Sequence, residues 1–342
     1  MTWWAMSALA WLSWCWAATS WELFPSGEGF YNYAPCAIED GRVHHFWWCQ
    51  NTDPHQVVDH IYYRRYEFEE NRWTPRELAL APGKPGQWDS LHVCDPAVVK
   101  GEFHYRGTDY AWLLFYLGTH DAACKHNQIG IALAHDPAGP WMRFAGNPVV
   151  KASASTWGVG QPSVVSLDRR SRLLLFYTRQ EDDLSTHTYL SELDLSDMDN
   201  PTITPPIRVP TDGLAEQLGA AGVVLNNADF ALDPAGEIVY TVRPLHPNAF
   251  AMDGKLPGIS SHLELARIQA ADLRAGKGRW ERVAVIGPQE TGFAHNHNAA
   301  IARDPYGYLP NPKHLRINLT VAARGPEPLW SYTLHGIVLE LH

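Results

Sequence analysis

Two aspartates and two histidines are the residues whose types and spacing best suit acid–base chemistry. Asp95 precedes Pro96 in a short apolar segment, and Asp229 stands in a related segment further along the chain. His295 and His297 are two residues apart, which places them on one side of a strand. Hydrolysis needs one group that protonates the leaving oxygen and another that activates water. We expect Asp95 to act as base or charge stabiliser, with Asp229 as its partner and His297 as a candidate general acid.

Each of these residues also has a plainer interpretation. An aspartate before proline can cap a turn, so Asp95 suits a structural role as well. His297 suits three roles: an acid–base group, a neighbour of a channel cation such as calcium, or a hydrogen-bonded structural residue. No CxxC pair is present, and two histidines alone do not make a zinc site. We therefore expect no protein-bound metal centre, and the chemistry requires no cofactor.

A second group of side chains has the polar or aromatic character that binds sugar hydroxyls and ring faces. Trp157 precedes a predicted strand and suits a sugar-stacking platform, or plain packing. Arg179 and Arg243 end two similar strands, FYTR and YTVR, so both are candidates to bind hydroxyls or to pair with an aspartate. A salt bridge between structural units is the alternative. The full set of candidate binding residues is Gln161, Asn226, Asn227, Trp157, Arg179, Arg243 and His295.

A repeat positions these residues. Five short segments, each starting with a small or polar residue, recur about every 65 residues: Ala34–Ile38, Asp95–Val99, Gln161–Val165, Asn226–Phe230 and His297–Ile301. A strand rich in aromatic and β-branched residues follows each one: Val43–Cys49, Tyr110–Leu117, Arg172–Thr178, Glu237–Val242 and Leu315–Ala322. Five equal units, each long enough for four strands, predict an all-β fold, a five-bladed β-propeller with about four antiparallel strands per blade.

The propeller has one rival, a pair of β-sandwich domains. The equal spacing and the absence of a Pro/Gly/Ser-rich linker favour a single propeller over residues 20–342. The segment Leu329–Leu341 is expected to supply the last strands and close the ring. The starts of the five first strands then meet at the axis, so Ala34, Asp95, Gln161, Asn226 and His297 are expected to form a polar ring there.

One unit resembles a known group of enzymes. The strand Asp95–Val99, the aromatic strand around Trp112–Tyr116, the segment Ile129–Ala132 and Gly139-Pro140-Trp141 look like one blade of the five-bladed glycoside hydrolases of family 43 and their arabinanase and β-fructosidase relatives. The resemblance spans residues 30–340 and is strongest in the second and third blades.

This resemblance implies that substrate binds at one mouth of the channel. There the first three blades supply, in order, a base or nucleophile, a modulating aspartate and a glutamate that acts as the general acid. Asp95 keeps the second position, whereas Ala34 and Gln161 occupy the other two. Two of the three carboxylates are therefore missing, which puts the mechanism of that family in doubt and leaves the fold argument untouched.

Charge and composition limit the kinds of partner and the compartment that the sequence predicts. The net charge is −10 and no basic run occurs, so a nucleic-acid surface is excluded. Residues 1–18 are apolar and uncharged, and they resemble a signal peptide cleaved near Ala17 or Ala18. This predicts a secreted or periplasmic protein without a stable membrane span after processing. The five cysteines leave four after processing, and Cys36 and Cys94 are candidates for a disulfide or for buried thiols.

Together these patterns predict an exported glycoside hydrolase. Its partner would be an oligo- or polysaccharide, most simply a furanoside glycan, cleaved at the channel mouth by carboxylate and histidine catalysis. A propeller that binds a glycan without cleaving it is the alternative, which the missing carboxylates favour. A scaffold for another protein has no positive feature in the sequence. We expect a monomer or a small homo-oligomer.

Overall fold

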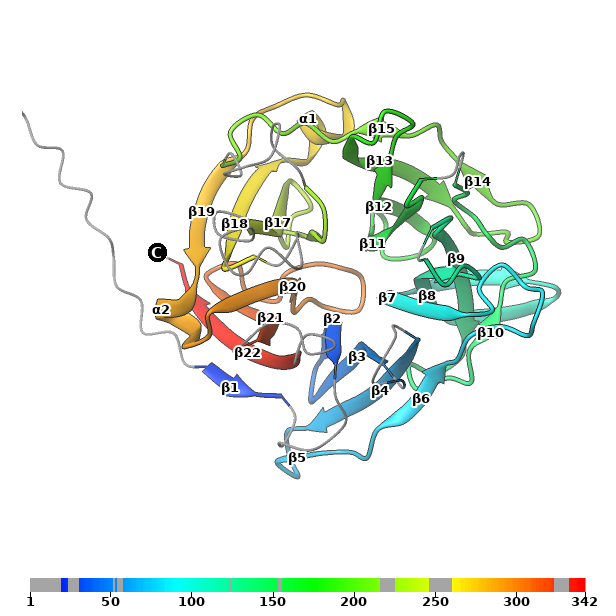
Figure 1. Cartoon of the computed structure of the whole chain (residues 1–342), viewed down its shortest axis with the longest axis horizontal. Helices are drawn as coiled ribbons and strands as arrows, with labels where there is room; N and C mark the ends of the chain where they lie inside the picture. Colours follow the sequence, from blue (N-terminus) through cyan, green and yellow to red (C-terminus); the bar gives the residue numbers. More distant parts are fainter. Residues whose placement is uncertain are drawn as a thin grey trace, which may run out of the picture.

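The computed structural model describes residues 20–23, 31–51, 53, 58–123, 125–152, 156–215, 225–245, 260–322 and 332–341. Five antiparallel sheets stand around a central axis, and Figure 1 looks down that axis onto the ring. The five-bladed β-propeller predicted from the repeat is confirmed. The predicted signal peptide, residues 1–18, lies outside the described residues.

The strands of each blade follow the chain from the axis outward. Blade 1 holds β2 (Asn32–Asp40), β3 (Val43–Asn51), β4 (Asp59–Glu67), β5 (Arg72–Trp73) and β6 (Glu77–Leu80). Blade 2 holds β7 (His92–Tyr105), β8 (Thr108–Thr119), β9 (Gln128–Ala134) and β10 (Met142–Arg143). Blade 3 holds β11 (Val159–Ser166), β12 (Arg172–Gln180), β13 (Thr186–Asp194), β14 (Thr202–Ile203) and β15 (Ile207–Arg208).

The last two blades complete the ring. Blade 4 holds β16 (Asp229–Leu232), β17 (Ile238–Leu245), β18 (His262–Gln269) and β19 (Glu281–Ile286). Blade 5 holds β20 (His295–Ile301), β21 (His314–Ala322), β22 (Thr333–Glu340) and β1 (Ser20–Glu22). Two short helices, α1 (Ala270–Arg274) and α2 (Pro288–Thr291), lie on the outside of the ring (Figure 1). No helix within the described part of the chain has the length and apolar character of a membrane span.

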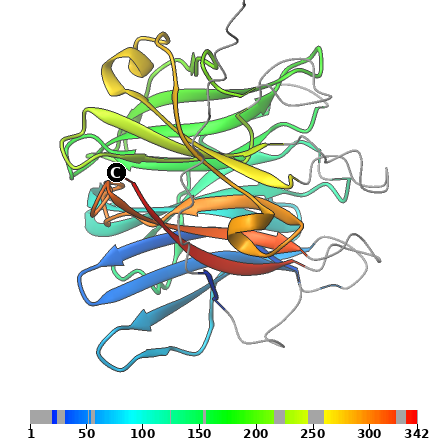
Figure 2. The ribbon, with the colours of Figure 1, turned by 90° about the vertical axis from the view of Figure 1, so that its left-hand side faces the viewer.

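Ring closure differs from the prediction. The C-terminal segment supplies only β22, the third strand of blade 5, and the outer strand is the N-terminal β1. Ser20 pairs with Ile337 and Glu22 pairs with His335, and Figure 2 shows β1 beside the red β22. One blade is therefore built from both ends of the chain, which joins the first and last blades. The sequence did not reveal this pairing because β1 is three residues long.

Apolar side chains between neighbouring blades form the core. Phe176 of blade 3 stacks on Phe230 of blade 4 with ring centroids 4.0 Å apart. Trp47 and Trp48 of blade 1 have at most 2% of their surface exposed, so these two aromatic residues pack rather than face a ligand. Because alternate residues of each central strand face opposite neighbours, every sheet is buried on both sides. This explains why the second strands are so rich in apolar residues.

Candidate active site

The five innermost strands share a backbone feature at the axis. Ala34, Asp95, Gln161, Asn227 and Asn298 all have positive φ angles, between 36° and 53°. Strand pairing is irregular at four of these points, as in a β-bulge. Non-glycine residues rarely adopt this conformation, and such strain gathers at functional sites. All five residues line the channel.

This feature corrects the predicted register in two blades. In blade 4 the equivalent position belongs to Asn227, and in blade 5 it belongs to Asn298. The sequence comparison had placed Asn226 and His297 there, one residue too early. The first three copies contain a proline that fixes the alignment, whereas the last two have alanine in its place. Without that marker a shift of one residue could not be detected.

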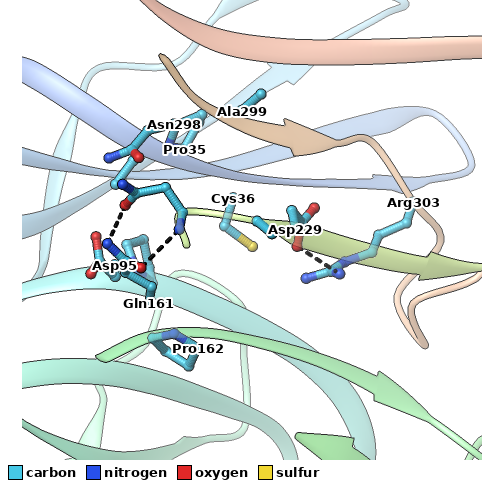
Figure 3. A pocket seen from close by; sticks show the side chains of 13 residues that line it. Pro35, Cys36, Asp95, Gln161, Pro162, Asp229, Asn298, Ala299 and Arg303 are labelled. Atoms are coloured by element: carbon cyan, nitrogen blue, oxygen red, sulfur yellow. Dashed lines mark hydrogen bonds and ion pairs between the residues drawn. The ribbon is translucent and has the colours of Figure 1, made fainter. Parts of the chain in front are cut away.

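The ring divides the axis into a mouth and a channel. Asp95, Gln161, Asn227 and Asn298 line both a mouth cavity of about 170 Å³ and a narrower channel of about 50 Å³. Side chains and backbone are linked around the ring. The Gln161 side-chain oxygen accepts from the Asn227 backbone NH at 2.8 Å, and the Gln161 amide group also bonds the Asn227 side chain (Figure 3). Two predicted binding residues therefore do meet at the axis.

Asp95 is the acidic residue at the mouth. Burial raises the pKa of its carboxyl to about 6; the nearby Asp59 carboxylate acts in the same direction, while His92 and the Gln161 backbone NH oppose it. A carboxyl with a pKa near 6 can hold or release a proton at mildly acidic to neutral pH. The structure thus places Asp95 where the repeat predicted it, in an environment suited to proton transfer.

Beside Asp95 lies a group that the sequence analysis missed. The Asp59 side chain is fully buried and contacts His92 Nδ1 at 3.0 Å. Its carboxylate also accepts a hydrogen bond from the Tyr33 hydroxyl at 2.5 Å. Tyr33 and His92 both line the mouth cavity. Asp59 begins β4 and His92 begins β7, and neither residue belongs to the repeat motif that guided the prediction.

Asp229 has a different environment. It stands two residues beyond the ring position, deeper in the channel, and Figure 3 shows it with Arg303 at the opposite end from Asp95. Its carboxylate accepts from Ser163 Oγ at 2.6 Å, from the Ile301 backbone NH at 2.9 Å and from Arg303 at 3.1 Å. These bonds join blades 3, 4 and 5. This position fits a structural role for Asp229, holding three blades together, better than the predicted role as the catalytic partner of Asp95.

The two histidines of blade 5 are buried beside the ring. His297 Nδ1 lies 3.1 Å from Ser260 Oγ, and Nε2 lies 3.4 Å from the Asn227 side-chain nitrogen. His295 has only 1% of its surface exposed. Neither residue lines the mouth cavity or the channel. This placement fits the structural alternative for the pair, and the acid role of His297 stays a prediction.

Trp157 lines the mouth cavity, as the platform interpretation requires. Its backbone carbonyl accepts from the Asn127 side chain at 2.8 Å, and its backbone NH donates to Gln180 at 2.8 Å. The next residue, Gly158, has φ +98°, and a Cβ there would lie 2.3 Å from the Asn127 carbonyl oxygen. Only glycine fits this turn, so it fixes the approach of Trp157 to the mouth.

The two arginines differ from their predicted roles. Arg243 has no exposed side-chain surface and pairs with Glu264 at 2.6 Å within blade 4. This placement fits the salt-bridge alternative better than the predicted contact of Arg243 with a ligand, because the guanidinium lies in the sheet interior. Arg179 keeps about a third of its side chain exposed and lies 3.4 Å from Glu181. Both arginines lie near the ends of second strands, but neither pairs with Asp95 or Asp229 in a described contact.

The disulfide also differs from the predicted candidate. Cys94 is bonded to Cys49, whose Cα lies 5.3 Å away, and Cys36 is a buried free thiol in the channel. Cys94 precedes the ring residue Asp95, whereas Cys36 follows Ala34 by two positions, so the two sulfurs face different neighbours. Cys49, Cys94 and Asp95 are the only potential metal-binding cluster in the described parts of the chain, and the disulfide occupies both sulfurs.

A larger cavity of about 490 Å³ lies at the other end of β7 and β8. Its charged groups are already paired: His104 lies 2.7 Å from Asp109, and Arg170 lies 2.6 Å from Glu102. Size alone does not indicate function, because this surface lacks a group with the environment of Asp95. The channel mouth is therefore the better candidate for chemistry.

Solved structures share this architecture. A family 117 glycoside hydrolase of the marine bacterium Zobellia galactanivorans superposes with a TM-score of 0.61 and 12% identity, over 94% of this chain and 89% of that one. An α-L-arabinofuranosidase of Podospora anserina, solved with cellotriose, gives 0.55 and 13% identity, over 93% of both chains. An endo-arabinase of Bacteroides thetaiotaomicron gives 0.55 and 14%, over 91% and 94%.

At this level of identity the likeness establishes the fold. The chain has the five-bladed propeller architecture of these glycoside hydrolases over nearly its whole length. No protein-family model matches the sequence, and no curated protein matches it either. The chemistry therefore has to be argued from the site itself.

Proposed function

We propose that this chain is a glycoside hydrolase that cleaves a glycan at the channel mouth, with Asp95 as its proton-transferring carboxyl. The observation that carries the proposal is the position of Asp95. It lies on the innermost strand of blade 2, lines the mouth cavity, and has a pKa raised to about 6 by burial. Structural neighbours with the same blade arrangement are named as glycoside hydrolases, which agrees with this use of the mouth.

The substrate class follows from the neutral, amide-rich ring. Gln161, Asn227 and Asn298 offer both donors and acceptors around Asp95, which suits sugar hydroxyls. Trp157 adds an aromatic face at the same cavity. Two of the neighbours are named as an α-L-arabinofuranosidase and an endo-arabinase, so we infer a furanoside glycan as the first substrate to test. The proposal includes a channel cation such as calcium, for which the amide oxygens would serve as ligands.

Export is part of the same proposal. The bond between Cys49 and Cys94 joins blades 1 and 2, and disulfides persist mainly in oxidising compartments. This supports the inference from residues 1–18 that the chain is secreted or periplasmic, where polysaccharide substrates are found.

The second candidate is a propeller that holds a glycan without cleaving it. The observation in its favour is that Ala34 and Gln161 share the backbone conformation of Asp95 but carry no carboxylate. Asp229 cannot replace them directly, since its oxygens accept three hydrogen bonds, including one from Arg303. In this case Asp95 would bind a hydroxyl instead of exchanging a proton.

Hydrolysis of a panel of furanoside and pyranoside polysaccharides separates the two. The panel would be incubated with the wild type, with Asp95→Asn, and with Asp109→Asn as a matched control on the exposed far end of β8. We expect the wild type and the control to release sugar, and Asp95→Asn to lose about 10²- to 10⁴-fold in rate.

Two results would change this conclusion. A wild type that cleaves no glycan but melts at a higher temperature with one of them would show a binding module. A folded Asp95→Asn variant with undiminished activity would move the chemistry away from this carboxyl.

A further inference from the structure

We propose that His92, oriented by Asp59, is the general base that activates water in this site, with Asp95 as the general acid. The inference rests on the proposed function and names a second catalytic residue for it. It starts from a position that the repeat does not cover, because His92 precedes the motif of blade 2 by three residues.

The geometry resembles that of an oriented imidazole base. His92 Nδ1 lies 3.0 Å from Asp59 Oδ2, and the Asp59 carboxylate is completely buried. The Asp59 backbone nitrogen also lies 3.4 Å from Nδ1, but the shorter contact with the carboxylate favours the tautomer with Nδ1–H, which leaves Nε2 to accept a proton. His92 itself lines the mouth cavity. When the ring gains a proton, the nearby carboxylate stabilises the imidazolium.

Tyr33 holds the other side of this arrangement. Its hydroxyl donates to the same Asp59 oxygen that faces His92. Burial and the neighbouring Asp59 charge raise the pKa of Tyr33 well above its ordinary value, so the hydroxyl keeps its proton. Tyr33 therefore acts as a donor that positions Asp59, and Asp59 in turn is a positioning residue for His92.

Blade 1 has alanine, not a carboxylate, at its ring position, so the base has to come from another residue. Ala34 follows Tyr33 in the chain and packs with the Cys49–Cys94 disulfide, with Leu117 and with Trp157. It brings no polar atom to the mouth. Asp59 belongs to the same blade and His92 to the next, so the pair supplies a base beside the position where blade 1 lacks a carboxylate.

The reaction balances with water as the only co-reactant. His92 Nε2 takes a proton from water while the water oxygen bonds the anomeric carbon. The bond from that carbon to the leaving oxygen breaks, and the leaving oxygen takes the proton of Asp95. The site is left with an imidazolium and a carboxylate, and a proton exchanged with solvent restores both. A single displacement of this kind inverts the anomeric configuration.

Leaving-group dependence tests the two roles separately. Rates would be measured on the glycan identified above and on a 4-nitrophenyl glycoside of the same sugar. Asp95→Asn should lose about 10²- to 10⁴-fold on the glycan and far less on the nitrophenyl substrate, whose leaving group needs no acid. His92→Gln should lose about 10²- to 10⁴-fold on both. His104→Gln, at the far end of the same strand, is the matched control.

The pH profile gives a readout that a structural role would not move. The titratable groups facing His92 are Tyr33 on β2, Asp59 and His60 on β4, and Asp95 on β7. Loss of the acid in Asp95→Asn should remove the limb on which activity falls as the pH rises. The limb that falls through about pH 6, where Asp95 loses its proton, should remain in His92→Gln.

A third readout needs no variant. The first-formed product of the wild type, followed by NMR, should have the inverted anomeric configuration. A retained configuration, or a folded His92→Gln that hydrolyses the nitrophenyl glycoside at the wild-type rate, would overturn the assignment of His92 while leaving the proposed function standing. A wild type that hydrolyses no glycan or glycoside would overturn both.

Discussion

The two channel carboxylates, Asp95 and Asp229, look alike in sequence and differ in every contact. Asp229 accepts bonds from Ser163, from the Ile301 backbone NH and from Arg303, whose side chain is 2% exposed. Asp95 has no arginine or lysine beside it in the described contacts, and burial raises its pKa to about 6. One carboxylate is compensated by a buried cation, and the other is left poised to exchange a proton.

This difference separates stability from function. A buried ion pair is strongly destabilised when one partner is removed, because the other charge stays in the protein interior. A buried carboxyl without a cation destabilises the folded state whenever it is ionised. Natural proteins retain such unfavourable groups mainly where activity needs them. The contrast therefore assigns Asp229 to the fold and Asp95 to the chemistry.

The largest expected effect comes from removing the Asp229 carboxylate, which bonds blades 3, 4 and 5 together. Asp229→Asn should lower the free energy of unfolding by about 3–5 kcal/mol, because Arg303 would remain buried without a counter-charge. Urea denaturation measures this loss. Asp304→Asn serves as the control, since Asp304 pairs with the half-exposed Arg169 at 3.0 Å. A change below about 1 kcal/mol at Asp229, typical of exposed pairs, would remove the contrast.

The disulfide should have the next largest effect. Cys49 and Cys94 are 45 residues apart, and closing a loop of that length stabilises a fold by about 2–4 kcal/mol. Replacing both cysteines by alanine should lower the free energy of unfolding by that amount. Cys36→Ala controls for loss of a buried thiol without loss of a cross-link. If the double variant and Cys36→Ala lose the same free energy of unfolding, the disulfide contributes nothing beyond packing.

Asp95→Asn should have a smaller effect of the opposite sign. The folded-state pKa of Asp95 is about 6, above its ordinary value of 3.8, so the folded protein binds this proton more tightly than the unfolded chain does. Its stabilising contribution is complete below about pH 4 and is lost as the pH rises through about 6. At pH 8 the asparagine variant should be more stable than the wild type by about 2–3 kcal/mol.

The pH dependence of this difference is its own control. Near pH 3.5 the carboxyl is protonated in the folded state and mostly protonated in the unfolded chain, so the two proteins should unfold at nearly the same urea concentration. An asparagine variant that is less stable than the wild type at pH 8 would mean that the Asp95 carboxylate supports the fold, as Asp229 does.

The fold was predictable because five short, similar segments recur along the chain. The X-Pro pairs at Ala34, Asp95 and Gln161 fixed the first three innermost strands, and the structure confirms them. Blades 4 and 5 lack the proline, so their register was wrong by one residue. Ring closure by β1 could not be predicted, since three residues carry no detectable periodicity.

The site was only partly predictable. Asp95, Gln161, Asn227 and Trp157 do meet at the mouth. Tyr33, Asp59 and His92 come together from two blades, and their proximity depends on the curvature of the ring rather than on any spacing in the chain. The burial of Arg243 could not be predicted, because its position near the end of a strand does not reveal that its side chain pairs with the buried Glu264.

NMR titration of the Asp95 carboxyl carbon in the wild type, assigned with Asp95→Asn, tests directly whether this group carries the transferred proton. We expect a midpoint near pH 6, with Asp95 protonated under mildly acidic conditions. A midpoint near or below the ordinary value of 3.8 would show that Asp95 is ionised under mildly acidic conditions, and would contradict its assignment as the proton-transferring group.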